Sequence, residues 1–216
     1  MDELTPALPV LLVFIAASLV LAVTPGPGVF YIVTRSAAEG RKAGLASVLG
    51  VALGNLASAV GASLGLASII ATSAVAFEIV RYLGALYLFL LAWKAVRPRG
   101  PAAERSVRLP RSENARVLRD GFVVAVLNPK TMLFFAAFLP QFVVPGSMQA
   151  VQPLVLGLLF VLIAASTDTL YALFAALVSP YLSRASSAVS ATRFAAGAAY
   201  FGLGVFAVLS GHRGDR

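Results

Sequence analysis

The sequence has no cysteine, a single histidine and few charged residues. The one histidine among its 216 residues is His212, and Asp, Glu, Lys and Arg together make up 12% of the chain. Without cysteine the chain forms no disulfide and no thiolate metal site, and one imidazole is too few for a histidine metal site. We therefore expect neither a metal nor any other cofactor. The charged fraction is also about half that of a soluble domain.

Hydrophobic residues make up 59% of the chain, and its mean hydropathy is +0.89. They are concentrated in six runs of roughly 20 residues or more, the length that an α-helix needs to cross a hydrocarbon core about 30 Å thick. Strands of a membrane β-barrel are much shorter and alternate between polar and apolar residues. The sequence thus predicts an all-α integral membrane protein with six transmembrane helices, at residues 8–34, 44–74, 76–96, 121–145, 153–179 and 194–211.

Lysine and arginine are unevenly divided among the links between these runs. Alternate links are basic, whereas the N-terminal segment has Asp2 and Glu3 and residues 140–153 carry no charge. Because basic loops stay in the cytoplasm, we expect a multi-pass membrane protein with the basic links in the cytoplasm and both termini outside. The basic links contain Arg35, Arg41 and Lys42, then seven arginines in residues 97–119, and finally Arg184 and Arg193.

The arginine-rich link at 97–119 has two interpretations. Its seven arginines against Glu104 and Glu113 supply +5 of the formal net charge of +8. A nucleic-acid patch would have aromatic residues among the arginines, and this segment has none. A cytoplasmic anchor that faces anionic lipid accounts for the same charges. We therefore expect anionic lipid as a partner and no nucleic acid.

The stretch TPGPG, residues 24–28, interrupts the first run. Pro25 and Pro27 have no N–H, so the carbonyls of Leu21 and Val23 lose their usual helical partners. In hydrocarbon such carbonyls are tolerated only against protein or a water-filled cavity. A kink that serves packing alone is the alternative, but two prolines and two glycines in five residues favour a binding site. The candidate residues here are Thr24, Pro25, Gly26 and Pro27.

A second interruption lies in the fourth run, where Asn128, Pro129 and Lys130 follow one another. Pro129 is expected to free the carbonyl of Ala125, and a lysine within a membrane span is costly and marks a functional position by default. Alternatively, Lys130 snorkels to the interface and the helix starts there, which leaves only about 15 apolar residues for the span. We therefore favour a broken helix with Lys130 inside the membrane.

The two interruptions resemble each other. TPGxxVFY from Thr24 matches NPKxxLFF from Asn128 at an offset of 104 residues, and GALYLFL from Gly84 matches GAAYFGL from Gly197 at an offset of 113. Two copies of a three-helix unit explain both matches, and because three is odd the second copy is inverted in the membrane. We expect a first repeat at 1–96, a basic cytoplasmic linker at 97–120 and a second, inverted repeat at 121–216, with helices 1 and 4 broken.

Four residues lie at one depth in this arrangement. At about 1.5 Å per helical residue, Pro25, Asn55, Lys130 and Asp168 lie about 13 to 18 Å from the cytoplasmic ends of their runs, near the bilayer centre. Asn55 and Asp168 are also 113 residues apart, the offset of the second match. The four elements are therefore expected to line one cavity. The glycine pairs Gly50/Gly54 and Gly61/Gly65 have the small-xxx-small spacing and are expected to seat helices closely.

Taken with their surroundings, these stretches resemble the LysE/RhtB family of amino-acid exporters. The likeness covers nearly the whole chain, through TPGPG, EGRKAGLASVLGVALG, NPK followed by AAFLPQF, and GALYL. It implies six helices, export of amino acids or related metabolites from the bacterial cytoplasm, and coupling to the proton gradient. The family's substrates include basic, hydroxylated and branched amino acids. The neutral Asn55 disfavours lysine or arginine, because an acid there would pair with a cationic side chain.

For a zwitterionic substrate the candidate residues divide by charge. Half-helix N-termini and Lys130 suit the carboxylate, whereas Asp168 and the freed carbonyls suit the ammonium group. Neutral hydrogen bonds are expected from Thr24, Asn55 and Asn128, and Tyr87 and Tyr200 are either cavity walls or plain packing.

These features predict a secondary active exporter that works by proton antiport, with Asp168 releasing its proton when the substrate's ammonium group binds. A passive channel for small polar solutes would need a continuous polar stripe, which the sparse polar residues do not supply. A non-transporting membrane scaffold would leave Lys130 and Asp168 unexplained. An enzyme is not expected, because no Ser/His pair, carboxylate pair or metal cluster appears. A homo-oligomer is compatible with the sequence.

Overall fold

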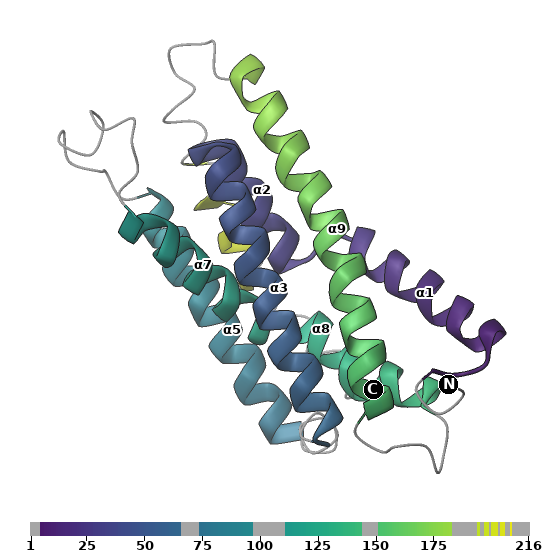
Figure 1. Ribbon diagram of the computed structural model, residues 1–216. Helices are drawn as coiled ribbons and strands as arrows, with labels where there is room; N and C mark the ends of the chain where they lie inside the picture. Colours follow the sequence, from purple (N-terminus) through teal and green to yellow (C-terminus); the bar gives the residue numbers. More distant parts are fainter. Residues whose placement is uncertain are drawn as a thin grey trace.

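The structure is a computed structural model that describes residues 5–65, 74–96, 111–143 and 151–182, with some of the residues from 194 to 208. Every regular element within these ranges is a helix, and no strand occurs in them. The helices form a bundle in which α3 (Arg41–Ser63) packs against α9 (Val151–Leu182), as Figure 1 shows. The all-α expectation is therefore confirmed for the described part of the chain.

The first apolar run folds as two helices that meet at a bend. α1 (Leu8–Val23) and α2 (Pro27–Glu39) are separated by three residues and differ in direction by 49°. Pro27 is the first residue of α2, a position where the missing N–H costs nothing. After α2 the chain turns at Gly40, and α3 begins at the next residue. The φ of Gly40 is 87°, a backbone angle that residues other than glycine rarely adopt.

The second broken helix contains α7 (Arg111–Val126) and α8 (Pro129–Leu133). Beyond α8 the chain continues as a π-helical turn, η1 (Phe134–Phe138), and a 3₁₀ turn, η2 (Leu139–Phe142), and the two halves are bent by 47°. Both expected breaks are therefore present. α7 begins at Arg111, inside the segment expected to be a linker, and residues 97–110 of that segment lie outside the described residues.

The described helices supply two to four membrane spans. By length and composition, α3 and residues Val151–Val178 of α9 can each cross a membrane, and each of the two bent pairs counts as one further span. α5 (Ala74–Val96) contains a shorter apolar stretch, Tyr82–Trp93. Half of the expected sixth helix and the outer end of the second lie outside the described residues, so the six-helix count stays a prediction.

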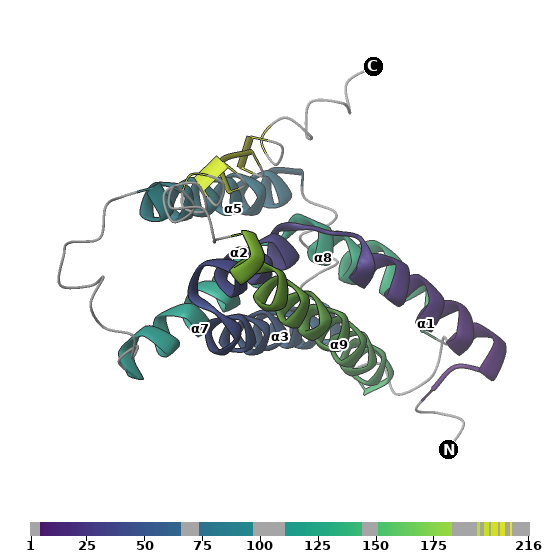
Figure 2. The ribbon, with the colours of Figure 1, turned by 90° about the horizontal axis from the view of Figure 1, so that it is seen from above.

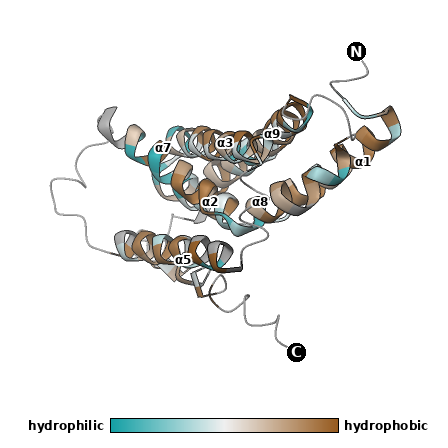
Figure 3. Cartoon of the chain, turned by 90° about the horizontal axis from the view of Figure 1, so that it is seen from below, coloured by the Kyte–Doolittle hydropathy of each residue, from teal (hydrophilic) through white to brown (hydrophobic). Residues whose placement is uncertain are grey.

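The outer surface of the bundle is apolar. Figure 3 shows hydrophobic residues along most of α1, α5 and α9. Helices that are apolar on their outer faces as well as towards the core suit a hydrocarbon environment, because lipid replaces water around them. On α9 the exposed large apolar side chains are Val151, Leu158, Leu162, Leu170, Phe174 and Leu177.

Small residues on α3 allow α7 to approach closely. A Cβ added at Gly50 would lie 2.2 Å from the carbonyl oxygen of Leu118, and one at Gly54 would lie 2.6 Å from another carbonyl oxygen of α7. The expected close packing at this pair is confirmed. A Cβ at Gly61 or Gly65 would meet nothing within 4 Å among the described atoms, so the same expectation for the second pair stays a prediction. Gly65, with a φ of 78°, lies just beyond the end of α3.

The C-terminal segment lies beside α5, on the side away from α9 (Figure 2). The rings of Phe89 and Phe201 have centroids 5.3 Å apart. A Cβ at Gly197 would lie 2.4 Å from a side-chain carbon of Val96. The described residues of the sixth expected run thus pack on the third run, as neighbours in the same bundle.

Candidate functional site

The carbonyls that the prolines free at the first break are bound by side chains from other helices. The Leu21 carbonyl accepts a hydrogen bond from Nζ of Lys130 at 2.6 Å, and the Val23 carbonyl accepts one from the hydroxyl of Tyr171 at 2.7 Å. Lys130 Nζ also donates to the carbonyl of Thr24. Since an unpaired carbonyl in hydrocarbon is costly, these contacts explain how a bilayer tolerates the break.

At the second break, nearby groups of the same segment make the hydrogen bonds. The Asn128 N–H donates to the Ala125 carbonyl at 3.1 Å, so that carbonyl is not left free by Pro129, contrary to the expectation from sequence. Asn128 is the N-cap of α8, and its Oδ1 accepts from the Lys130 N–H at 3.1 Å. A short side chain that can cap a helix is therefore what this position requires.

Lys130 joins the two breaks. Its backbone is in the first turn of α8, and its ammonium group lies at the end of α1, where it bonds to two carbonyls. Gly26 makes room for this reach, because a Cβ there would lie 3.2 Å from Cδ of Lys130 and 3.7 Å from Nζ. The side chain is thus inside the protein at the level of the first break, and it does not extend away from the bundle.

A small pocket with a cavity volume of about 40 Å³ lies where the two breaks meet α3 and α9. Asn55 reaches it from α3 and Asp168 from α9, and both are 5% exposed. Oδ1 of Asn55 has no hydrogen-bond partner among the described residues, and no ion pair joins Asp168 to Lys130. Five residues expected at the site border this pocket: Gly26, Asn55, Asn128, Lys130 and Asp168.

Other expected site residues lie elsewhere. Thr24 and Pro25 are exposed, and the Thr24 hydroxyl donates to its own helix at Val20. A smaller hollow, with a cavity volume of about 10 Å³, is bordered by Pro27, Pro129 and Tyr87. Tyr200 borders neither pocket. It is 3% exposed, and its hydroxyl donates to a backbone carbonyl of α2 at 3.5 Å, so it packs inside the bundle.

Several pocket residues have no polar group that would reveal them in the sequence. Phe160 and Ala164 precede Asp168 by eight and four residues, and Val51 precedes Asn55 by four. Residues four apart share one face of a helix, so the spacing to the two polar residues was the available signal. Together these side chains form an apolar part of the pocket wall, on the same helix faces as Asn55 and Asp168.

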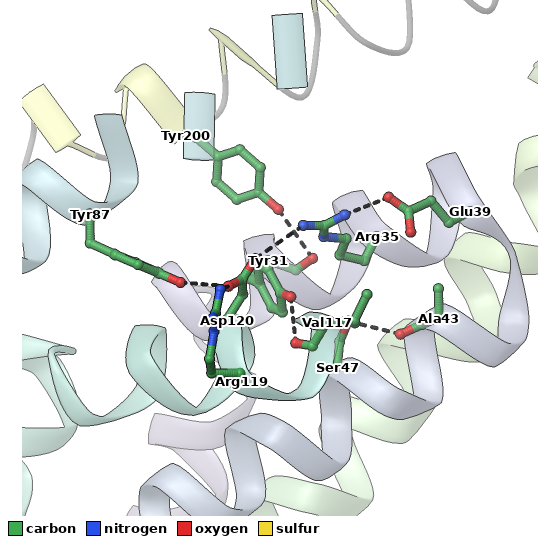
Figure 4. Close-up of polar contacts among 10 residues, drawn as sticks. All are labelled: Tyr31, Arg35, Glu39, Ala43, Ser47, Tyr87, Val117, Arg119, Asp120 and Tyr200. Carbon is green, nitrogen blue, oxygen red and sulfur yellow. Dashed lines mark hydrogen bonds and ion pairs between the residues drawn. The ribbon is translucent and has the colours of Figure 1, made fainter. Parts of the chain in front are cut away.

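A second polar cluster joins α2, α5 and α7 (Figure 4). Its centre is Asp120, whose side chain is fully buried. Arg35 lies 3.6 Å from one carboxylate oxygen, and Tyr87 donates to the other at 2.9 Å. The more exposed Arg119 is 3.4 Å from the same carboxylate, and Arg35 also pairs with Glu39 on its own helix. The carboxylate thus binds groups from three helices.

The Tyr31 ring packs within this cluster. Its hydroxyl donates to the backbone carbonyl of Val117 at 2.7 Å, and the Arg35 guanidinium carbon lies 5.5 Å from its ring centre. The cluster was not expected from the sequence. There Arg35 was used only as one of the basic residues that place the first link in the cytoplasm. Within this cluster, Arg35 lies seven residues beyond Gly28, which is about 10 Å along α2 towards its C-terminal end.

The site has the properties of a binding pocket. The pocket between the breaks brings together one ammonium group, one carboxylate, an amide oxygen that has no partner among the described residues, and several apolar side chains. Within the described residues no three side chains from His, Asp and Glu are grouped as a metal ion would require.

Known proteins resemble this chain along most of its length. The family model for LysE type translocators matches residues 19–211. The homoserine/homoserine lactone efflux proteins of Salmonella typhi and Salmonella typhimurium are each 29% identical to it over 169 residues, which are 78% of this chain and 82% of each relative. An uncharacterized membrane protein of Vibrio cholerae is 29% identical over 171 residues, covering 79% of this chain and 83% of the relative. No solved structure matches the chain.

Proposed function

Because this chain belongs to the LysE type translocator family, we propose that it is a secondary active exporter of a small amino acid or a related metabolite. The observation that carries the proposal is the pocket bordered by both helix breaks and by polar residues of α3 and α9. In transporters with broken helices, substrate and coupling sites lie at such breaks near the membrane midplane.

The proposed substrate is an amino acid with a small uncharged side chain. The names of the two Salmonella relatives favour homoserine or its lactone. Lys130 and the N–H groups at the start of α2 suit the carboxylate, and Asp168 with Asn55 suits the ammonium group. The apolar wall at Phe160 is left for the side chain. A dibasic substrate would bring a second cation for which the pocket has no second acid.

The proposed architecture is a pair of inverted three-helix repeats. In support, each predicted repeat begins with a bent helix, by 49° in the first and 47° in the second, and continues with a long unbroken helix. We place the basic links in the cytoplasm of a bacterium and both termini outside. Alternating access then arises when one repeat moves against the other around the pocket. The arginine-rich link is proposed to face anionic lipid.

The proposed coupling is proton antiport through Asp168. A carboxylate that pairs with the substrate's ammonium group gives up its proton when substrate binds and takes one when substrate leaves. One site therefore alternates between a proton and a substrate, which is the requirement for exchange. Lys130 is the neighbouring cation, and it keeps the charge of the pocket low when Asp168 is ionised.

Transport by the purified protein tests the proposal. The full chain is reconstituted into liposomes loaded with labelled homoserine, and an imposed proton gradient should drive export against the homoserine gradient. A passive channel would release homoserine only down its gradient, and a scaffold would release none. Liposomes without protein and liposomes with the Asp168→Asn variant give the background. If the rate of homoserine release does not depend on the proton gradient, proton antiport is contradicted and a passive channel becomes the better explanation.

A further inference from the structure

The ammonium group of Lys130 occupies a site for a cation that two backbone carbonyls form. The Leu21 carbonyl is free because Pro25 has no N–H to bond it, and Thr24 is the C-cap of α1, so its carbonyl also points beyond the helix. Lys130 Nζ lies 2.6 Å from the first oxygen and also bonds to the second. Two carbonyls at the negative end of a helix dipole favour any primary ammonium group.

A zwitterionic amino acid carries that same group. We propose that the carbonyls of Leu21 and Thr24 are the subsite for the substrate's ammonium group, and that Lys130 fills this subsite until substrate displaces it. This inference rests on the proposed export of an amino acid. Leu21 borders the pocket together with Asp168 and Asn55, so an ammonium group in the pocket lies next to the residue that supplies one of the two carbonyls.

The displaced Lys130 keeps a partner when the ligand is a zwitterion. Its ammonium group is a mobile point charge on a four-carbon stem, and the ligand's carboxylate arrives in the same pocket. Each ammonium group then has hydrogen-bond acceptors, and no charge is left unpaired in the protein interior. A cation without a carboxylate offers Lys130 no such exchange. The wild-type pocket should therefore bind a ligand that carries both groups more tightly than one, such as the lactone, that carries the amine alone, although both can be bound.

Two ligands separate these cases. Homoserine is a zwitterion, whereas homoserine lactone has the same amine but its carboxylate is closed into an ester. Binding of both is measured by isothermal titration on the purified full chain in detergent, at a pH where the lactone amine is protonated. In the Lys130→Met variant the subsite is vacant, so the lactone should bind about tenfold tighter and homoserine about tenfold more weakly than in the wild type. Lys42→Met, at an exposed lysine, should change neither.

Loss of a positive charge alone would also favour the lactone, so a second pair of variants isolates the carbonyl. Pro25→Ala restores an N–H that can bond the Leu21 carbonyl within the helix, and this removes an acceptor from the subsite without changing any charge. Pro27→Ala is the matched control, because its N–H would face the Val23 carbonyl, which Tyr171 binds. In the Lys130→Met background, Pro25→Ala should return lactone affinity to within about threefold of the wild type, and Pro27→Ala should keep the gain.

Three results would overturn the inference. If Lys130→Met changes affinity for both ligands in the same direction, Lys130 does not compete with the ligand's amine. If the gain for the lactone survives Pro25→Ala, charge alone explains it and the carbonyls are no subsite. If the wild type binds neither ligand, the proposed substrate class is wrong and the subsite falls with it. Thermal unfolding of each variant shows that the titrated protein is folded.

Discussion

Arg35 on α2 and Asp120 on α7 face each other inside the bundle, with a guanidinium nitrogen 3.6 Å from a carboxylate oxygen. The Asp120 side chain has no exposed surface, and that of Arg35 is 16% exposed. The hydroxyl of Tyr87 on α5 completes the contact at 2.9 Å. A charge buried among three helices is stable only while its partners remain, so the cluster fixes how these helices sit together.

Removing the carboxylate should therefore destabilise the protein. Asp120→Ala leaves Arg35 and Tyr87 without this partner, and we expect a loss of about 3 to 5 kcal/mol in the free energy of unfolding. Asp120→Asn keeps an oxygen for Tyr87 and should lose less. Thermal unfolding of the purified variants in detergent measures both.

Arg119→Ala is the control for this prediction. Arg119 also lies near Asp120, at 3.4 Å, but its side chain is 66% exposed. An exposed ion pair contributes less than about 1 kcal/mol, so this variant should unfold near the wild-type temperature. Equal losses in Asp120→Ala and Arg119→Ala would show that burial of the carboxylate does not matter.

The contact between α3 and α7 gives a second prediction about stability. Gly50→Ala places a Cβ 2.2 Å from the Leu118 carbonyl oxygen, so one helix must move away from the other. Such overpacking costs about 1 to 3 kcal/mol or more. Gly61→Ala makes the same change on the same helix at a position where a Cβ meets nothing within 4 Å in the described part of the chain. It should be neutral or should stabilise the helix by up to about 1 kcal/mol. Thermal unfolding compares the two, and equal behaviour would contradict the close packing.

The helix breaks and the main pocket residues could be predicted because their causes are local. Proline removes an N–H wherever it occurs, so the carbonyls of Leu21 and Val23 were recognisable from the letters alone. Helical rise then put Pro25, Asn55, Lys130 and Asp168 at one depth, and the structure places the last three around one pocket, whereas Pro25 is exposed. Both inferences use only distances along the chain.

What could not be predicted depends on how helices cross. The pairing of Arg35 with Asp120 needs α2 beside α7, and charge counting had assigned Arg35 to a link. Lys130 and Tyr171, which bind the freed carbonyls of Leu21 and Val23, each lie more than 100 positions along the chain from those carbonyls. The Ala125 carbonyl was expected to be free, but a local bond from Asn128 satisfies it. Proline identifies which helical bond is lost and not which group replaces it.

Topology can be tested because the chain has no cysteine of its own. A single cysteine at Ser106, in the arginine-rich link, should react with a membrane-impermeant thiol reagent only from the cytoplasmic side. One at Ser147, in the uncharged link, should react only from outside, because the distribution of basic residues sets both sides. Both positions lie outside the described residues. Labelling is compared between right-side-out and inside-out vesicles. The reverse pattern would contradict the proposed topology, with the basic links in the cytoplasm.

The role of Asp168 in coupling gives the last prediction. Asp168→Asn removes the proton-binding group but keeps a side chain of nearly the same size with an oxygen that can accept from an ammonium group. Export against a homoserine gradient, driven by an imposed proton gradient in liposomes, should therefore be abolished. Exchange of labelled for unlabelled homoserine without any gradient should continue, because exchange needs binding and movement of the repeats but no net proton. Asn55→Ala is the control: it also alters a buried pocket residue, but it removes no titratable group, so it should weaken both activities together and leave their ratio unchanged. If Asp168→Asn liposomes still concentrate homoserine outside in response to the proton gradient, Asp168 does not carry the coupling proton and has only a binding or structural role.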